Sequence, residues 1–401
     1  MLLLRRLHMA VAPRDAAAAA AFARLGVNST SLGALADQRI VSPTPIQTLA
    51  IPVLLGGRSA LLSAETGSGK TLAFALPLAE RLVSHEAKLG CRASPGSPRA
   101  LVLLPTRELA SQVGAEFKKL SHHFRFAARV LAGGNGRKAI KQALASPVDV
   151  LVSCPHMLRD LAARNDVRLR AVQALVVDEA DTMLNSHSGF ADDVTAVARQ
   201  CPAAAQIVLA GATVKGRGYC RDWLRQLRGE GAFDVVETEG AGRLPVQIKL
   251  VVETVDEYDK HPALLDTVRA AVARNARLIV FCNSVPSCRS TAHVLEAFAS
   301  QAGIADVCSL HGDMLPMQRA EAWRRFTSTP APAIAVCTDV AARGLDVADV
   351  DHVVLFDVPR GEEDFVHRAG RTGRGGKGGR VTVIAGRGEK DWAQALLQRA
   401  R

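Results

Sequence analysis

One eight-residue segment constrains the fold of this chain more than any other: Ala64-Glu65-Thr66-Gly67-Ser68-Gly69-Lys70-Thr71. It follows a short apolar run and precedes a long helix-compatible stretch, which is the strand–loop–helix setting of a phosphate-binding loop. Glycines let backbone N–H groups close around phosphate oxygens, and the helix N-terminus adds positive potential. Ala64 replaces the usual first glycine. We expect Lys70 to reach the β- and γ-phosphates of a nucleotide and Thr71 to ligate Mg²⁺.

Short β-rich runs recur along the chain, with helix-compatible stretches between them. They lie at 60–63, 100–104, 149–153, 173–177 and 206–210, and then at 246–252, 277–281, 305–310, 333–337, 351–356 and 380–384. Apolar runs that alternate with helices are typical of a parallel α/β sheet buried on both faces. The sequence therefore predicts two α/β domains, 21–239 and 246–401, joined by a Gly- and Pro-containing linker at 240–245.

Composition excludes several classes of protein. A hydrophobic fraction of 48% excludes a mainly disordered chain. No apolar run approaches the ~18–20 residues that a membrane helix needs. The eight cysteines include no Cys-x-x-Cys pair, so we expect reduced thiols rather than a disulfide scaffold or a zinc site.

Charge is concentrated in the first part of the chain. Residues 1–243 hold 30 basic and 20 acidic side chains, whereas residues 244–401 hold 20 and 19. A basic first half indicates a polyanionic partner, and a generally basic compartment is the alternative interpretation.

Residues 1–20 are predicted to form a leader. The first fourteen contain three arginines and no acid, and four leucines could share one helix face. This composition is typical of a mitochondrial transit peptide. The alternative is a disordered basic start of a cytoplasmic protein, with Met9 as the initiator.

An acidic segment, Asp178-Glu179-Ala180-Asp181, follows the run at 173–177. Open α/β sheets place their sites at the carboxyl ends of strands. Asp178 can hold Mg²⁺, directly or through water, and Glu179 can take a proton from an attacking water.

A basic segment in the second domain completes this chemistry. It reads His367-Arg368-Ala369-Gly370-Arg371-Thr372-Gly373-Arg374. Transfer of a phosphoryl group needs positive charge on the γ-phosphate in the transition state, and the planar fork of arginine supplies it. We therefore expect both domains to contribute to one site.

These three segments, in this order, resemble those of the DEAD-box RNA helicases of superfamily 2, and the resemblance runs from about Phe22 to Ile384. It implies two RecA-like parallel-sheet domains in tandem that use ATP. Ser42–Gln47 looks like the segment that reads adenine, and Gln47 carries the donor and acceptor that match the base edge. By the same resemblance Phe22 packs on the base and Asp346 touches the ribose.

Further roles follow from the resemblance alone. Arg371 and Arg374 would be the arginine fingers, and His367 would bridge to Asp181 or Thr213 when the domains close. Pro105–Ala110, Gly133-Gly134, 280–284 and 338–346 match RNA-contacting or coupling motifs. The residues expected to contact RNA are Pro105, Thr106, Arg107, Gly134, Arg319 and Thr338.

Three motifs depart from the family pattern. Gly211-Ala212-Thr213 replaces Ser-Ala-Thr, Cys154-Pro155-His156-Met157 replaces Thr-Pro-Gly-Arg, and Pro316-Met317-Gln318-Arg319 keeps only the arginine of Gln-x-x-Arg. The first loses a hydroxyl that helps couple hydrolysis to strand separation. A serine restored at Gly211 is therefore expected to improve strand separation.

The resemblance implies an ATP- and Mg²⁺-dependent RNA helicase or RNA clamp. RNA would be held through phosphates and 2′-hydroxyls with little sequence preference. The sequence holds no Arg-Gly tail or added RNA-binding domain, so we expect partners in a ribonucleoprotein, such as a ribosome under assembly, to choose the target.

Two other functions are considered. The alternative is a scaffolding subunit that binds RNA or protein with little ATP turnover; the eroded RNA motifs favour it, and the intact Lys70, Glu179, Arg371 and Arg374 count against it. A DNA helicase is disfavoured because Ser42–Gln47 and Pro105–Ala110 match the RNA-acting family.

Overall fold

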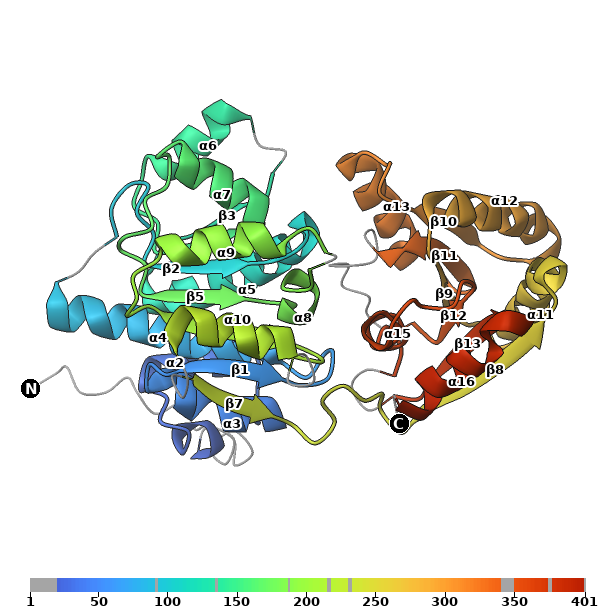
Figure 1. Cartoon of the computed structure of the whole chain (residues 1–401), viewed down its shortest axis with the longest axis horizontal. Coiled ribbons are helices and arrows are strands. Elements are labelled where there is room, and N and C mark those ends of the chain that lie inside the picture. Colours follow the sequence, from blue (N-terminus) through green and yellow to red (C-terminus); the bar gives the residue numbers. More distant parts are fainter. Residues whose placement is uncertain are drawn as a thin grey trace, which may run out of the picture.

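The computed structural model describes residues 20–90, 93–133, 136–186, 188–214, 218–229, 233–339, 350–373 and 377–399. Two domains lie next to each other and are joined by an extended segment (Figure 1). Four predictions fall outside the described residues: almost all of the leader 1–20, Gly134, Asp346 and Arg374.

The first domain is a seven-stranded sheet in the order β3-β4-β2-β5-β6-β1-β7, and every strand pair in it is parallel. Its strands are β1 (Ser59–Ser63), β2 (Ala100–Leu103), β3 (Ala128–Leu131), β4 (Val150–Ser153), β5 (Ala174–Val177), β6 (Gln206–Gly211) and β7 (Phe233–Glu237). Its helices are α2 (Ser29–Asp37), α3 (Pro45–Leu55), α4 (Lys70–Leu89), α5 (Arg107–Phe124), α6 (Arg137–Leu144), α7 (Pro155–Ala163), α8 (Ala180–Met183), α9 (Ala191–Gln200) and α10 (Gly218–Arg228).

The second domain is a six-stranded parallel sheet in the order β10-β11-β9-β12-β13-β8. Its strands are β8 (Ile248–Val255), β9 (Arg277–Cys282), β10 (Asp306–Leu310), β11 (Ala333–Thr338), β12 (His352–Leu355) and β13 (Gly379–Gly386). Its helices are α11 (Lys260–Val272), α12 (Val285–Ala302), α13 (Pro316–Ser328), α15 (Glu362–Ala369) and α16 (Lys390–Arg399), with 3₁₀ turns η1 (Glu257–Asp259) and η3 (Arg387–Glu389).

Both faces of the first sheet are buried. The neighbouring residues Leu61 and Leu62 of β1 belong to two different apolar clusters, one on each side of the sheet. Successive side chains of a strand point to opposite faces, so a strand between two helical layers must be apolar at every position. This is why the continuous apolar runs predict a parallel α/β fold, and the prediction of two such domains is confirmed.

The structure contains two strands that the apolar runs do not predict, β3 and β7. Both lie at the edges of the first sheet. Edge strands are covered less completely, and Arg129 of β3 and Val235 of β7 are exposed. An apolar-run criterion therefore misses them.

Two predictions from composition can be compared with the structure. No helix in the described part of the chain is long and apolar enough to cross a bilayer. The seven cysteines within the described ranges are free and buried, and burial raises the pKa of each thiol for which a shift is resolved, for example to about 12 for Cys282. Cys91 lies outside the described residues.

Candidate nucleotide and RNA site

The phosphate-binding loop joins β1 to α4. Gly67 and Gly69 have φ angles of +80° and +88°, in the left-handed region that favours glycine. A Cβ atom on Gly69 would also lie only 2.6 Å from the amide nitrogen of Gln47. The Nζ atom of Lys70, the first residue of α4, donates to the carbonyl oxygens of Ala64 and Glu65 at 2.7 and 2.8 Å.

Gln47 connects the predicted adenine-reading segment to this loop. Its Oε1 atom accepts from the backbone N–H of Thr44 at 3.0 Å, and its Nε2 atom donates to the carbonyl oxygen of Gly69 at 3.2 Å. The amide thus holds the start of α3 against the loop. Phe22, predicted to pack on the base, is 1% exposed and lies in the apolar core instead of lining the cavity described below.

The acidic segment begins where β5 ends. Burial, followed by the nearby Glu179 carboxylate, raises the pKa of Asp178 to about 7, while Lys70 acts in the opposite direction. Glu179 has a φ angle of +50°, in the left-handed region, which is uncommon for a residue with a side chain. Its Oε2 atom is buried without a hydrogen-bond partner in the described structure. The end of β5 therefore presents two adjacent carboxyl groups to the cavity described below.

Asp181 is completely buried at the junction of the domains. Its Oδ2 atom accepts from the backbone N–H groups of Ala212 and Thr213 at 3.0 and 2.8 Å and from the Thr213 hydroxyl at 2.9 Å. The Nε2 atom of His367 lies 3.7 Å from the same oxygen. The structure thus brings together the three residues predicted to couple the domains.

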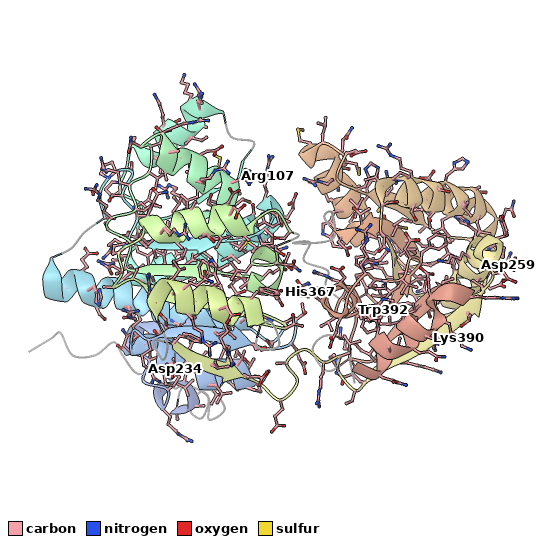
Figure 2. All side chains as sticks on the ribbon, in the orientation of Figure 1. Arg107, Asp234, Asp259, His367, Lys390 and Trp392 are labelled. Atoms are coloured by element: carbon pink, nitrogen blue, oxygen red, sulfur yellow. The ribbon has the colours of Figure 1, made fainter. Side chains whose placement is uncertain are left out.

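Mutual charge sets the protonation of this pair. Burial acts to raise the pKa of Asp181, but His367 and the Thr213 donors outweigh it and hold the pKa well below its usual range. Burial acts to lower the pKa of His367, but Asp181, with Glu179 and Glu363 nearby, raises it. Charge favours an imidazolium facing a carboxylate across the domain boundary. His367 lies on the side of the second domain that faces the first (Figure 2).

A second contact across the boundary is not predicted by the sequence motifs. The Thr182 hydroxyl donates to Oε1 of Glu363 at 2.8 Å, and both side chains are buried. Glu363 precedes His367 by one helical turn of α15, so consecutive residues of α8 contact one face of that helix. In the sequence, Thr182 is visible only as a threonine directly after the acidic motif, and nothing there connects it to Glu363.

One cavity joins the two domains. It has a volume of about 760 Å³. The first domain contributes Gln47, Thr66, Gly67, Gly69, Lys70, Thr71, Asp178 and Glu179 to its lining, and the second contributes His367 and Arg371. Gly370 approaches the loop so closely that its Cβ atom would lie 3.3 Å from the Thr66 hydroxyl. This cavity therefore combines a phosphate loop, an acidic pair and a cation from the opposite domain.

Arg368 has a structural role in the same segment. It is almost completely buried, and its guanidinium donates to both carboxylate oxygens of Asp339 at 2.7 and 2.6 Å and to the side-chain oxygen of Asn283 at 2.6 Å. These bonds connect α15 to the ends of β9 and β11. Arg368 thereby orients the helix that carries His367 and Arg371.

Pro105, Thr106 and Arg107, which are predicted to contact RNA, follow the carboxyl end of β2. Thr106 caps α5 by accepting from the N–H of Leu109 at 3.2 Å. A Cβ atom on Gly133 would lie 2.8 Å from Nε of Arg107, so the glycine leaves space for this arginine. Arg107 lies on the side of the first domain that faces the second (Figure 2).

In the second domain, Arg319 and Thr338 complete this predicted surface. Arg319 forms an ion pair with Glu108 across the boundary, with a nitrogen–oxygen distance of 3.4 Å. The Thr338 hydroxyl, at the end of β11, is buried without a hydrogen-bond partner among the described atoms. Arg319 therefore also holds the domains together, a role that its motif alone did not indicate.

Comparison with known proteins places this geometry in a family. A DEAD/DEAH box helicase profile matches residues 44–220, and a helicase conserved C-terminal domain profile matches residues 259–376. The ATP-dependent RNA helicase SrmB of Escherichia coli is 34% identical over 353 residues, which cover 88% of this chain and 75% of that protein. The chain belongs to the DEAD-box RNA helicase family.

Another relative is longer than this chain. DEAD-box ATP-dependent RNA helicase 39 of Arabidopsis thaliana is 33% identical over 379 residues, which cover 91% of this chain but 59% of that protein.

Among solved DEAD-box structures, a variant of S. cerevisiae Dbp5 bound to RNA and ADP BeF3 is 25% identical, with a TM-score of 0.79 over 95% of this chain and 93% of that one. A Dbp5 variant bound to a Gle1 variant and IP6 is also 25% identical, with a TM-score of 0.69 over 94% and 92%. The structure of this chain is therefore more similar overall to the Dbp5 variant bound to RNA and ADP BeF3 than to the Dbp5 variant bound to the Gle1 variant and IP6.

Two departures from the DEAD-box pattern have structural explanations. Cys154 is buried before α7 with its thiol near the carbonyl oxygen of Ala132, at 3.8 Å. Met157, in place of the motif's arginine, packs partly buried against the core cluster on its side of the sheet. These two positions of the motif therefore contribute to packing.

Gly211 ends β6 beside Asp181. A Cβ atom at this position would lie 2.6 Å from Oδ1 of Asp181 and 2.5 Å from a methyl group of Val214. Both neighbours are fully buried, and Asp181 is held by three hydrogen bonds, so neither can move freely. The structure thus argues against the expectation that a serine would improve strand separation.

We expect Gly211→Ser to lower RNA-stimulated ATP turnover several-fold, because the added side chain displaces Asp181 from His367. Turnover and thermal unfolding of this variant should be compared with Gly388→Ser, where a Cβ atom would have no neighbour within 4 Å. A gain in unwinding by Gly211→Ser would show that Asp181 and Val214 adjust and that the missing hydroxyl was the limiting feature.

Proposed function

We propose that the chain is an ATP-dependent RNA helicase or clamp that hydrolyses ATP when RNA holds its domains together. The single observation that carries this proposal is the shared cavity, in which Lys70 and Glu179 of the first domain lie with Arg371 of the second. A site divided in this way is complete only when the domains are closed. Hydrolysis would therefore depend on whatever stabilises closure.

Each charged residue of the cavity would have one task. Lys70 would neutralise the β- and γ-phosphates, and Glu179 would accept a proton from the attacking water. Arg371 would stabilise the charge that develops on the transferred phosphoryl group. After hydrolysis, that charge is divided between two products, and the domains would separate and release RNA.

The residues present fit a divalent cation. Burial raises the pKa of Asp178, and a positive charge beside it would favour its ionised form. The Thr71 hydroxyl belongs to the same cavity lining. Asp178 and Thr71 would hold Mg²⁺. When bound, the ion would neutralise charge on the phosphate oxygens.

ATP turnover measured with and without RNA tests this function. We expect single-stranded RNA to stimulate turnover strongly and the same sequence of DNA to stimulate it weakly, because 2′-hydroxyl contacts distinguish the two. ATP binding without RNA-stimulated turnover would instead support the scaffolding function.

The partners and the cellular location of this protein are a separate proposal. The basic charge of residues 1–243 supports attraction to RNA but does not select a particular RNA. Partner proteins in a ribonucleoprotein, such as a ribosome under assembly, would therefore choose the target. The arginine-rich, acid-free first fourteen residues support a mitochondrial location. Co-purification from organelle and cytosolic fractions, with and without ribonuclease, tests both points.

A further inference from the structure

A strongly basic stretch of sequence lies beside the residues of the first domain that are predicted to contact RNA. Between Glu116 and Asp149 the chain has seven Lys and Arg residues and no Asp or Glu. They are Lys118, Lys119, Arg125, Arg129, Arg137, Lys138 and Lys141. Like charges close together repel one another, so a folded domain needs no such concentration for its own stability.

Helix α6 exposes the centre of this stretch. Ile140 and Leu144 are buried against the domain core, whereas Arg137, Lys138 and Lys141 are exposed. Residues spaced by three and four positions share one face of a helix, so the three cations project together from the solvent side. Nitrogen-tipped side chains surround α6 at the top of the first domain (Figure 2).

The edge strand adds a fourth cation on the same side. Arg129 lies two residues before Leu131 on β3, and Leu131 packs in the same apolar cluster as Ile140 and Leu144 of α6. Residues two apart in a strand point to the same face of the sheet. Arg129 is exposed and therefore lies on the α6 side of the edge strand. We call Arg129, Arg137, Lys138 and Lys141 the α6 surface.

The α6 surface makes no ion pair with any carboxylate that the structure describes. The two acids that flank the stretch already have partners. Glu116 pairs with Lys119 at 2.5 Å, and Asp149 pairs with the buried Arg99 at 2.6 Å. The charge of the α6 surface is therefore available to an external anion.

The position of the α6 surface favours RNA as that anion. Arg137 follows Gly133, beside which the Arg107 side chain lies, by four positions, and a chain spans at most ~14 Å over four positions. RNA that continues past the motif residues toward this end of the domain would come within reach of α6. The α6 surface carries no aromatic side chain on which a base could stack, so it can recognise only phosphate charge.

We propose that the α6 surface binds the phosphate backbone of RNA that continues beyond the strand held by the DEAD-box motifs, such as a flanking duplex. This inference rests on the proposed function. It assigns to this chain a second, sequence-independent RNA contact on the first domain. Such a contact would keep a structured RNA bound to the first domain while the DEAD-box motifs bind and release a single strand.

The test compares two RNAs and two variants. The RNAs are a short single strand that fills only the motifs and the same strand continued by a duplex, each measured by equilibrium binding with a non-hydrolysable ATP analogue over a range of salt. The variant Arg137→Gln/Lys138→Gln/Lys141→Gln removes three charges from the α6 surface. Its control, Lys249→Gln/Arg274→Gln/Lys390→Gln, removes three exposed charges from the second domain.

We expect the duplex extension to tighten binding to the unaltered protein and to the control. The α6 variant should lose about tenfold to 100-fold in affinity for the extended RNA at low salt, and its salt slope should fall by about 2 to 3. Its affinity for the short strand should change much less, because that strand does not reach α6.

Three results would overturn the inference. One is an α6 variant that binds the extended RNA like the control. Another is equal loss for the short and the extended RNA. The third is no gain from the extension but α6-dependent binding to anionic lipid vesicles, which would assign the α6 surface to a membrane. If the unaltered protein binds neither RNA, the proposed function itself fails.

Discussion

Replacement of Lys70 by alanine is expected to reduce RNA-stimulated ATP hydrolysis by about 100-fold or more, since one preorganised charge at a phosphoryl site is typically of that importance. Lys70 starts α4, and its ammonium group reaches back to the loop carbonyls of Ala64 and Glu65. Alanine leaves the β- and γ-phosphates without this cation. The measurement is steady-state ATP turnover with saturating RNA, together with nucleotide affinity.

The matched control is Lys249→Ala, which removes an exposed lysine of β8 in the second domain. It should turn over ATP at the rate of the unaltered protein. Undiminished RNA-stimulated turnover by the Lys70 variant would show that phosphate is bound elsewhere.

Glu179→Gln is expected to retain ATP binding and to lose about 10²- to 10⁴-fold in hydrolysis, the usual contribution of a general base. Glutamine keeps the shape of the side chain, whose Oε2 atom has no hydrogen-bond partner in the described structure, but it cannot take up a proton. The domains should therefore remain closed on RNA with ATP bound. Dissociation of labelled RNA after addition of excess competitor should be much slower than for the unaltered protein.

Glu296→Gln serves as the control for this prediction, because Glu296 is an exposed residue of α12. Hydrolysis by Glu179→Gln at the unaltered rate would mean that another group activates the water. Slow hydrolysis with rapid RNA release would contradict the proposed link between hydrolysis and opening.

The fold was largely predictable because its central strands are covered on both sides. All the apolar runs in the two domains correspond to strands, with ends displaced by no more than three residues. The strands β3 and β7 were not predicted, because an edge position tolerates charged residues such as Arg129 and Asp234 within these short strands. The edge strands β8 and β10 of the second sheet were predicted, so an edge position weakens the apolar pattern without always erasing it.

A binding site was also predictable where one short segment contains all the residues that form it. The phosphate loop needs the two glycines with left-handed backbone, Gly67 and Gly69, followed by Lys70, and that order is visible in the sequence. The role of Gly211 was not predictable in the same way. Its effect depends on Asp181 and Val214, which lie 30 residues before it and three residues after it and meet only in the folded domain.

By itself the sequence determined the two parallel α/β domains and the phosphate loop, because hydrophobic periodicity and backbone requirements act over a few neighbouring residues. Only the tertiary structure decided which side chains of the two domains meet. The pairs Asp181–His367, Thr182–Glu363 and Glu108–Arg319 each join residues more than 180 positions apart. Contacts between buried polar groups depend on distances of a few ångströms, which the packing of whole domains sets and no local pattern encodes.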